Sequence, residues 1–312
     1  MEINIWYWIG FLIFVVIMLM LDLGVFHKKD TEVKIKEALI WSVFWISLAL
    51  VFNIVVYYFF GKAQALDFFT AYVLEKSLSV DNLFVFIMIF SYFNIESKYQ
   101  HKVLFWGIFG ALIMRAIFIF AGVALIEKFS WIMYVFGAFL VYTGIHMIVG
   151  KSEEGFDPNK NFIIRSFRKM MPVTDDLTDP RFFVRKNGIL YATPFFLALL
   201  FIEASDVVFA VDSIPAVLSV SKDIFIVFTS NIFAILGLRS LYFALNGIME
   251  YFYYLKYALA GILSFIGLKM CINEFSIMFG YDFHITNFVS LGIIVTLLTV
   301  SIIFSIIHKK RA

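Results

Sequence analysis

Long apolar runs dominate this chain and restrict it to a fold in which helices cross a lipid bilayer. Mostly apolar segments of about 20 residues, the length a helix needs to span the hydrocarbon core, recur along the whole sequence. Apolar residues make up 62% of the 312 positions and charged residues only 15%. That polar content is too small to cover a water-soluble domain of this size. The sequence therefore predicts an all-α, polytopic membrane protein.

The apolar runs predict about nine transmembrane helices. Their ranges are near 6–26, 38–60, 67–93, 103–126, 130–149, 189–218, 223–246, 251–272 and 285–307. The predicted organisation is a peripheral pair of helices (1–60), a first repeat (61–150), a cytoplasmic loop (151–188), a second repeat (189–272), and a last helix with a cytoplasmic tail (273–312).

Basic residues are distributed unevenly between the two sides of this topology. With the N-terminus outside, 17 of the 25 Lys and Arg residues fall on the inner side, eight of them in 151–188. Only Lys62, Lys128 and Lys222 fall on the outer side. Because cytoplasmic loops carry an excess of Lys and Arg, the sequence predicts that the N-terminus lies outside and the C-terminus inside.

Five carboxylates lie inside predicted spans: Glu75, Asp81, Glu203, Asp206 and Asp212. A charged side chain at the centre of the bilayer costs about 2.5 to 3.5 kcal/mol on insertion scales, so such residues usually serve a function. Carboxylates at this depth are suited to hold a cation on its way across the membrane. We interpret these five residues as the ligands of a transported metal ion.

The acids occur in two motifs that share a register. Glu75 precedes Asp81 by six residues, as Asp206 precedes Asp212, and the span after each motif contains one Arg. The predicted spans that carry the two motifs run in opposite directions. Spans 3–5 and 6–8 are therefore predicted to be inverted repeats, which in transporters meet at a site near the middle of the membrane.

A continuous helix would turn residues six apart to faces about 120° from each other. The two acids of a motif could therefore bind the same ion only if the helix were interrupted between them. We expect local unwinding near 77–82 and 205–215, where Pro215 removes a backbone donor and serine side chains can bond to freed groups.

Other residues are predicted to assist or to compete with the acids. Possible additional ligands or pathway residues are Asn82, Ser77, Ser213 and Asp22. Possible charge partners, which could instead pair with the acids for a structural reason, are Arg115, Arg239 and Lys76.

The predicted ligands are oxygen atoms, with no His or Cys expected nearby. Such a site suits Mn²⁺, Mg²⁺ or Ca²⁺. Met88 could add a soft contact that favours Mn²⁺, although packing is its simpler role. His146 is interpreted as a helix-packing residue, and Asp67 as a solvated loop charge.

Several segments carry a recognisable pattern. They are LDLGVFH (21–27), EKSLSVDNLFVF (75–86), PVTDDLTDPRFFVR (172–185), YATPFFLALLFIEASDVVFAVDSIPAV (191–217) and FTSNIFAILGLRSLYF (228–243). Together they resemble the TerC family of bacterial integral membrane proteins, in the branch of the Alx and TerC proteins. The resemblance implies a multi-pass protein of the bacterial inner membrane, with manganese export attributed to several members, and the family's acids match the five carboxylates above.

The function predicted is export of Mn²⁺ to the periplasm by alternating access around the acidic centre, coupled to proton entry. The expected partners are the lipid bilayer, Mn²⁺ or another divalent cation, and protons. No enzymatic activity, prosthetic group or nucleic-acid partner is expected. One alternative is a membrane scaffold for tellurite resistance or for metal loading of exported proteins. The other is a membrane-bound redox modulator, which the single cysteine, Cys271, does little to support.

Overall fold

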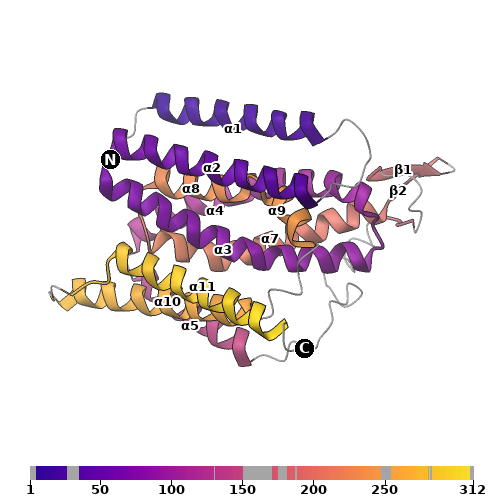
Figure 1. Cartoon of the computed structure of the whole chain (residues 1–312). Coiled ribbons are helices and arrows are strands. Elements are labelled where there is room, and N and C mark those ends of the chain that lie inside the picture. Colours follow the sequence, from indigo (N-terminus) through magenta and orange to yellow (C-terminus); the bar gives the residue numbers. More distant parts are fainter. Residues whose placement is uncertain are drawn as a thin grey trace.

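A computed structural model gives the fold of the chain (Figure 1). It describes residues 5–26, 35–129, 131–149, 171–174, 181–186, 188–246, 254–279, 281 and 283–309. The side chains of 22–26, 81, 84, 127, 277, 308 and 309 are outside this description. The predicted ligands Asp22 and Asp81 are therefore placed by their backbone alone, in α1 and α3.

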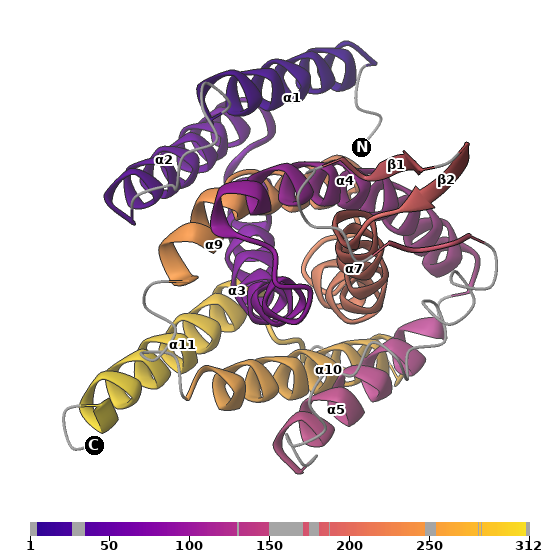
Figure 2. The same cartoon turned by 90° about the vertical axis from the view of Figure 1, so that its right-hand side faces the viewer.

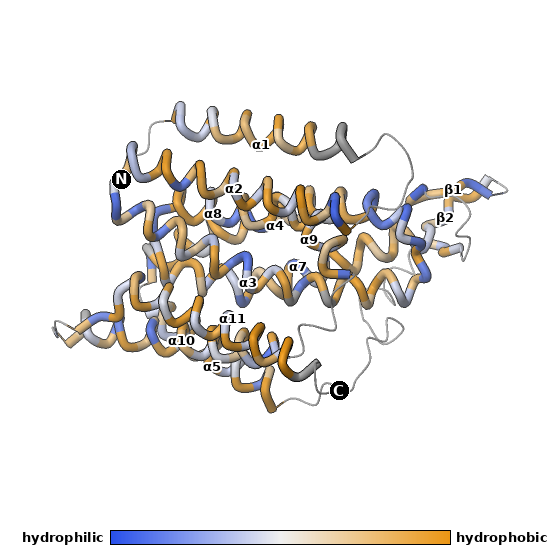
Figure 3. Tube along the Cα trace, viewed as in Figure 1, coloured by the Kyte–Doolittle hydropathy of each residue, from blue (hydrophilic) through white to orange (hydrophobic). Residues whose placement is uncertain are grey.

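Helices account for nearly all of the described residues. They are α1 (Ile5–Phe26), α2 (Ile35–Phe60), α3 (Lys62–Tyr92), α4 (Ser97–Lys128), α5 (Ile132–Val149), α7 (Pro194–Leu218), α8 (Ile224–Ile235), α9 (Leu238–Asn246), α10 (Leu255–Phe279) and α11 (Asn287–Lys309). The long helices run across Figure 1, but Figure 2 shows that they are inclined to one another: α3 and α7 are seen end-on, whereas α1, α2, α10 and α11 are seen at a slant. Apolar residues cover most of their length (Figure 3). The predicted all-α membrane fold is confirmed.

Seven helical segments of the described chain are long and apolar enough to cross a membrane. They are α2, α4, α5, α7, α8 together with α9, α10 and α11. The charges at Glu75, Lys76 and Asp81 explain why α3 is not among them, and α1 adds a shorter apolar stretch, Ile5–Leu21. The total of nine spans stays a prediction.

Viewed from one end, the helices form a central group with helices on both sides (Figure 2). The acidic helices α3 and α7 lie in the centre, next to α4, α8 and α9. Helices α1 and α2 lie on one side, and α5, α10 and α11 lie on the other. Both acidic motifs therefore lie in the interior of the helical array.

The chain enters α7 through a hairpin that the sequence analysis did not predict. Strands β1 (Phe183–Lys186) and β2 (Ile189–Ala192) pair antiparallel, and Gly188 takes a positive φ of 84° in the turn between them. The predicted start of a span at 189 is wrong, because α7 begins at Pro194. Proline suits the first turn of a helix, where its missing N–H would have no partner.

The predicted unwinding near 77–82 and 205–215 is also wrong, because α3 and α7 are continuous through both segments. The Oγ atoms of Ser77 and Ser205 donate to the carbonyls four residues earlier, at 2.6 and 2.8 Å. These bonds form within an intact helix. Pro215 lies in the last turn of α7, so the backbone hydrogen bond that it cannot donate is lost only near the end of the helix.

The interruption occurs instead between α8 and α9. Gly237 there has a φ of 80°, and a Cβ at this position would collide with the ring of Trp45 on α2. Only glycine fits such a conformation at so close an approach. The Nζ of Lys76 donates to the carbonyl of Ala234 at 3.0 Å, satisfying one of the acceptors freed at the end of α8.

Candidate functional site

A buried arginine joins the two acidic helices. Arg115 on α4 is 1% exposed, and its Nη1 forms an ion pair with Glu75 Oε1 of α3. Its Nη2 lies 3.3 Å from Asp206 Oδ1 of α7, and Nη1 donates to Asn231 Oδ1 of α8 at 3.0 Å. We call these four residues the Arg115 cluster. A buried charge is stabilised when it is paired and hydrogen-bonded. The cluster pairs Arg115 with both carboxylates, while Glu75 Oε2, Asp206 Oδ2 and Arg115 Nε have no hydrogen-bond partner among the described residues.

Glu203 lies one turn before Asp206 on α7 and is partly buried. Its carboxylate occupies the space where a side chain at Gly110 of α4 would be. The glycine therefore allows the carboxylate to lie directly against the backbone of α4, five residues before Arg115.

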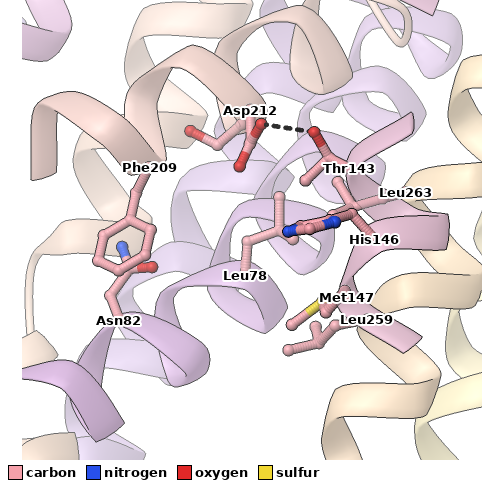
Figure 4. A pocket seen from close by; sticks show the side chains of 10 residues that line it. Leu78, Asn82, Thr143, His146, Met147, Phe209, Asp212, Leu259 and Leu263 are labelled. Carbon is pink, nitrogen blue, oxygen red and sulfur yellow. Dashed lines mark hydrogen bonds between the residues drawn. The ribbon is translucent and has the colours of Figure 1, made fainter. Parts of the chain in front are cut away.

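Asp212 faces a different place, a cavity of about 250 Å³ between four helices (Figure 4). Thr143 Oγ1 of α5 donates to Asp212 Oδ1 at 3.3 Å. The cavity is lined by Leu78 and Asn82 of α3, Thr143, His146 and Met147 of α5, Phe209, Asp212 and Ser213 of α7, and Leu259 and Leu263 of α10. We call it the Asp212 cavity.

The acids are thus divided between two places. Asp206 faces Arg115 and Asp212 faces α5, because a continuous helix turns residues six apart to different faces. Among the described side chains, no three His, Cys, Asp or Glu residues lie close enough together to hold a metal ion. Asn82 and Ser213 share the cavity with Asp212, whereas Ser77 bonds to its own helix.

The two other predicted charge partners lie elsewhere. Lys76 is bonded to the backbone of α8, as described above. Arg239 is 1% exposed at the start of α9, directly after the interruption at Gly237.

The expectation that no histidine lies near the site is wrong, because His146 lines the Asp212 cavity beside Thr143 and Met147. Met88, proposed as a soft contact, is 46% exposed on the outside of the helices. The sequence contained a signal that His146 could join a site: Thr143, His146 and Met147 are spaced so that they lie on one face of an apolar helix.

A second polar network lies where α3 begins and α7 ends. Lys269 of α10 is 1% exposed, and its Nζ donates to Asn287 Oδ1 at 2.7 Å. Asn287 Nδ2 in turn donates to Asp67 Oδ1 and to the carbonyl of Val220, both at 2.7 Å. The interpretation of Asp67 as a solvated loop charge is therefore wrong, since it takes part in a network that connects α3, α10 and α11.

The chain matches the family model described as integral membrane protein TerC family, over residues 60–312. The chain belongs to the TerC family. The resemblance noted in the sequence is confirmed, and the match begins just before α3 and extends through α11. It therefore includes both acidic motifs of this TerC-family chain.

Proteins that are similar over most of their length occur in several bacteria. An uncharacterized membrane protein of Myxococcus xanthus is 51% identical over 305 residues, which cover 98% of this chain and 93% of the relative. A protein of Escherichia coli strain K12, provisionally named membrane-bound redox modulator Alx, is 46% identical over 307 residues, covering 96% and 93%. An uncharacterized membrane protein of Rickettsia felis is 45% identical, covering 97% and 98%. No solved structure matches the chain.

Proposed function

We propose that this TerC-family chain exports a divalent metal cation, with Mn²⁺ as the first candidate, across the bacterial inner membrane. The observation that carries the proposal is the Asp212 cavity. There, a carboxylate in the interior of a helical membrane protein faces an open space together with the Asn82 amide and the Ser213 hydroxyl. Because a carboxylate is costly at this depth, a cation that binds and leaves gives it a role.

The arrangement of helices supports the predicted inverted repeat. Helix α4 contacts α7 as α3 contacts α8, and α5 contacts α7 as α10 contacts α3. The proposed repeat makes α3 equivalent to α7, α4 to the α8–α9 segment, and α5 to α10. Exchanging equivalent helices turns each of these contacts into the other member of its pair. The cavity is lined by α3, α7, α5 and α10, which the proposed repeat pairs as α3 with α7 and α5 with α10. Transporters built from inverted repeats bind their substrates at such an interface.

Proton antiport is the coupling that fits such a site. Protons and a metal ion compete for the same carboxylate, so binding of the metal releases protons. Export of a divalent cation against an inside-negative potential costs about 2.3 kcal/mol per charge per 100 mV. Two or more protons entering for each cation would supply that energy.

The printed name of the Escherichia coli relative suggests a redox role. This chain contains one cysteine in 312 residues, so it cannot form an internal dithiol–disulfide couple. Cys271 is half-buried on α10, and its Sγ lies 4.0 Å from the carbonyl oxygen of Tyr134. A charged group facing a cavity therefore supports transport more directly than the cysteine supports redox chemistry.

The proposed orientation has the N-terminus in the periplasm and the C-terminus in the cytoplasm. Reporter fusions at Lys62, Lys128 and Lys222 should then be periplasmic, and fusions in 151–188 or after His308 should be cytoplasmic. If fusions in 151–188 were periplasmic, the direction of transport proposed here would be reversed.

The function is tested in vesicles that contain the purified chain and a pH-sensitive dye. Mn²⁺ movement should be accompanied by opposite proton movement, and Asp212→Asn should abolish both. Glu96→Gln is the matched control, because Glu96 is a surface acid paired with Lys98 at 2.7 Å. Full Mn²⁺ transport by Asp212→Asn would sink the proposal, and a scaffold would show no transport in any variant. Transport without proton movement would remove only the antiport mechanism.

A further inference from the structure

The wall of the Asp212 cavity that α5 provides differs in chemistry from the walls that carry the acidic motifs. It presents the His146 imidazole and the Met147 thioether toward the same space as Asp212 (Figure 4). We propose that His146 is a direct nitrogen ligand of the cation, and that the cavity is thereby selective for transition-metal ions over Mg²⁺ and Ca²⁺. This inference rests on the proposed function, because it assigns the selectivity of the same site.

His146 is exposed on α5, at the edge of the cavity that it lines, and two contacts describe its surroundings. Thr143 lies one turn before it, and the hydrogen bond from Thr143 Oγ1 to Asp212 Oδ1 holds this face of α5 toward α7. The imidazole also stacks on the ring of Tyr142, with centroids 5.8 Å apart and planes inclined by 10°. This parallel ring contact leaves the ring nitrogens available at the edge of the imidazole.

The floor of the cavity contains a polar group that lacks a partner. Ser213 is 2% exposed, and its Oγ has no hydrogen-bond partner among the described residues. A buried hydroxyl without a partner is unfavourable. Asn82, which is 3% exposed, lines the same cavity from α3. An ion with its remaining water molecules would provide partners for both groups.

The combination of donors determines which ions are favoured. Mg²⁺ and Ca²⁺ bind almost entirely through oxygen atoms, and Mg²⁺ gives up its water molecules reluctantly. Imidazole suits Fe, Ni, Cu and Zn, and a thioether prefers softer ions than Mg²⁺. One carboxylate, one imidazole, neutral oxygens and a thioether therefore favour transition-metal ions over Mg²⁺ and Ca²⁺, and Mn²⁺ is the most weakly held of the first-row series. A single anionic ligand also allows the ion to leave, as transport requires.

If His146 only packs between helices, a bound metal ion should have no nitrogen ligand, whereas our proposal predicts one. We would purify the full chain in detergent, add MnCl₂ and record pulsed electron paramagnetic resonance of the bound ion. A nitrogen ligand produces a ¹⁴N coupling that an all-oxygen site lacks. The coupling should be present in the wild type, absent in His146→Gln and unchanged in His284→Gln. His284 is the control because it lies in the loop before α11 and does not line the cavity.

Competition experiments measure selectivity on the same samples. The wild type should bind Mn²⁺ at least about tenfold more tightly than Mg²⁺, and His146→Gln should lose about that factor, or ~1.4 kcal/mol. Met147→Leu should cause a smaller loss in the same direction.

The outcomes separate this inference from the proposed function. Mn²⁺ bound by the wild type without a ¹⁴N coupling, and weakened only by Asp212→Asn, would overturn the role of His146 and leave the cation site standing. Mn²⁺ binding that Asp212→Asn does not weaken would overturn the proposed function itself.

Discussion

The Arg115 cluster and the Asp212 cavity place similar carboxylates in opposite situations. Asp206 and Asp212 are six residues apart on one continuous helix, α7. Asp206 is 3% exposed and shares Arg115 with Glu75, whereas Asp212 faces an open space and accepts a hydrogen bond from Thr143. Asp206 is paired with a cation of the protein, whereas Asp212 is available to a ligand.

This difference suggests a division of labour between the two places. A buried ion pair resists separation, because removal of one partner leaves an uncompensated charge. The Arg115 cluster therefore joins α3, α4, α7 and α8 through polar contacts. The Asp212 cavity adds little rigidity, because its walls come from four helices that enclose an open space. We expect changes in the cluster to affect stability first, and changes in the cavity to affect transport first.

The largest effect should come from Arg115→Gln. This substitution leaves Glu75 and Asp206 buried without a cation, and the free energy of unfolding should fall by about 3 to 5 kcal/mol. Thermal unfolding of the purified protein in detergent gives the measurement. The double variant with Glu75→Gln should recover part of the loss. An Arg115→Gln protein as stable as the wild type would remove the contrast between the two places.

Asp212→Asn should impair transport without lowering stability, which is the opposite of the effect expected for Arg115→Gln. Transport of Mn²⁺ should fall at least about 100-fold, equivalent to ~2.7 kcal/mol, because the anionic ligand is lost. The melting temperature should stay the same or rise, since an uncharged side chain is easier to bury. A clear drop in melting temperature together with normal transport would show that Asp212 is structural.

Gly144→Ala should disturb the cavity while leaving the Arg115 cluster intact. A Cβ at this position would lie 2.6 Å from the carbonyl oxygen of Ala260 on α10, so the backbones of α5 and α10 would have to separate. Overpacking of this kind costs about 1 to 3 kcal/mol. Transport should be reduced because Thr143 and His146 move with α5. Gly292→Ala on α11 is the control, since its Cβ would meet nothing within 4 Å.

The smallest effect should come from Lys76→Met. Its described contact is one hydrogen bond to the carbonyl of Ala234, worth about 1 kcal/mol. A loss as large as that of Arg115→Gln would instead indicate that Lys76 balances the charge of Glu75, and the cluster would then contain two cations.

Much of the fold could be predicted because membrane helices are defined by length and polarity. The apolar runs located the long helices, and the high cost of membrane charges pointed to Glu75, Arg115 and Asp206, which the structure places together. The start of α7 was missed because Ile189–Ala192 is as apolar as a helix, although it forms a strand. Composition alone does not distinguish the two over so short a segment.

The remaining errors concern contacts between helices. The interruption at Gly237 depends on Trp45 of α2, which lies far away in the sequence. Likewise, His146 acquires its chemical setting from Asp212, and Asp67 from Asn287. Local sequence contains the residue types but not the rotations of the helices that bring them together. The assignment of all five acids to one ion depended on unwinding that the helices do not show.

Glycines at the α5–α10 contact have a mechanical consequence. At Gly137 and Gly267 the two backbones touch, so no layer of flexible side chains separates them there. Such a backbone contact neither compresses nor shears easily, so α5 and α10 should behave as one rigid unit, which we call the panel. One wall of the Asp212 cavity belongs to this panel and the other to α3 and α7. If the cavity opens or closes, α5 and α10 should therefore move together as this panel, and His146 should move with them.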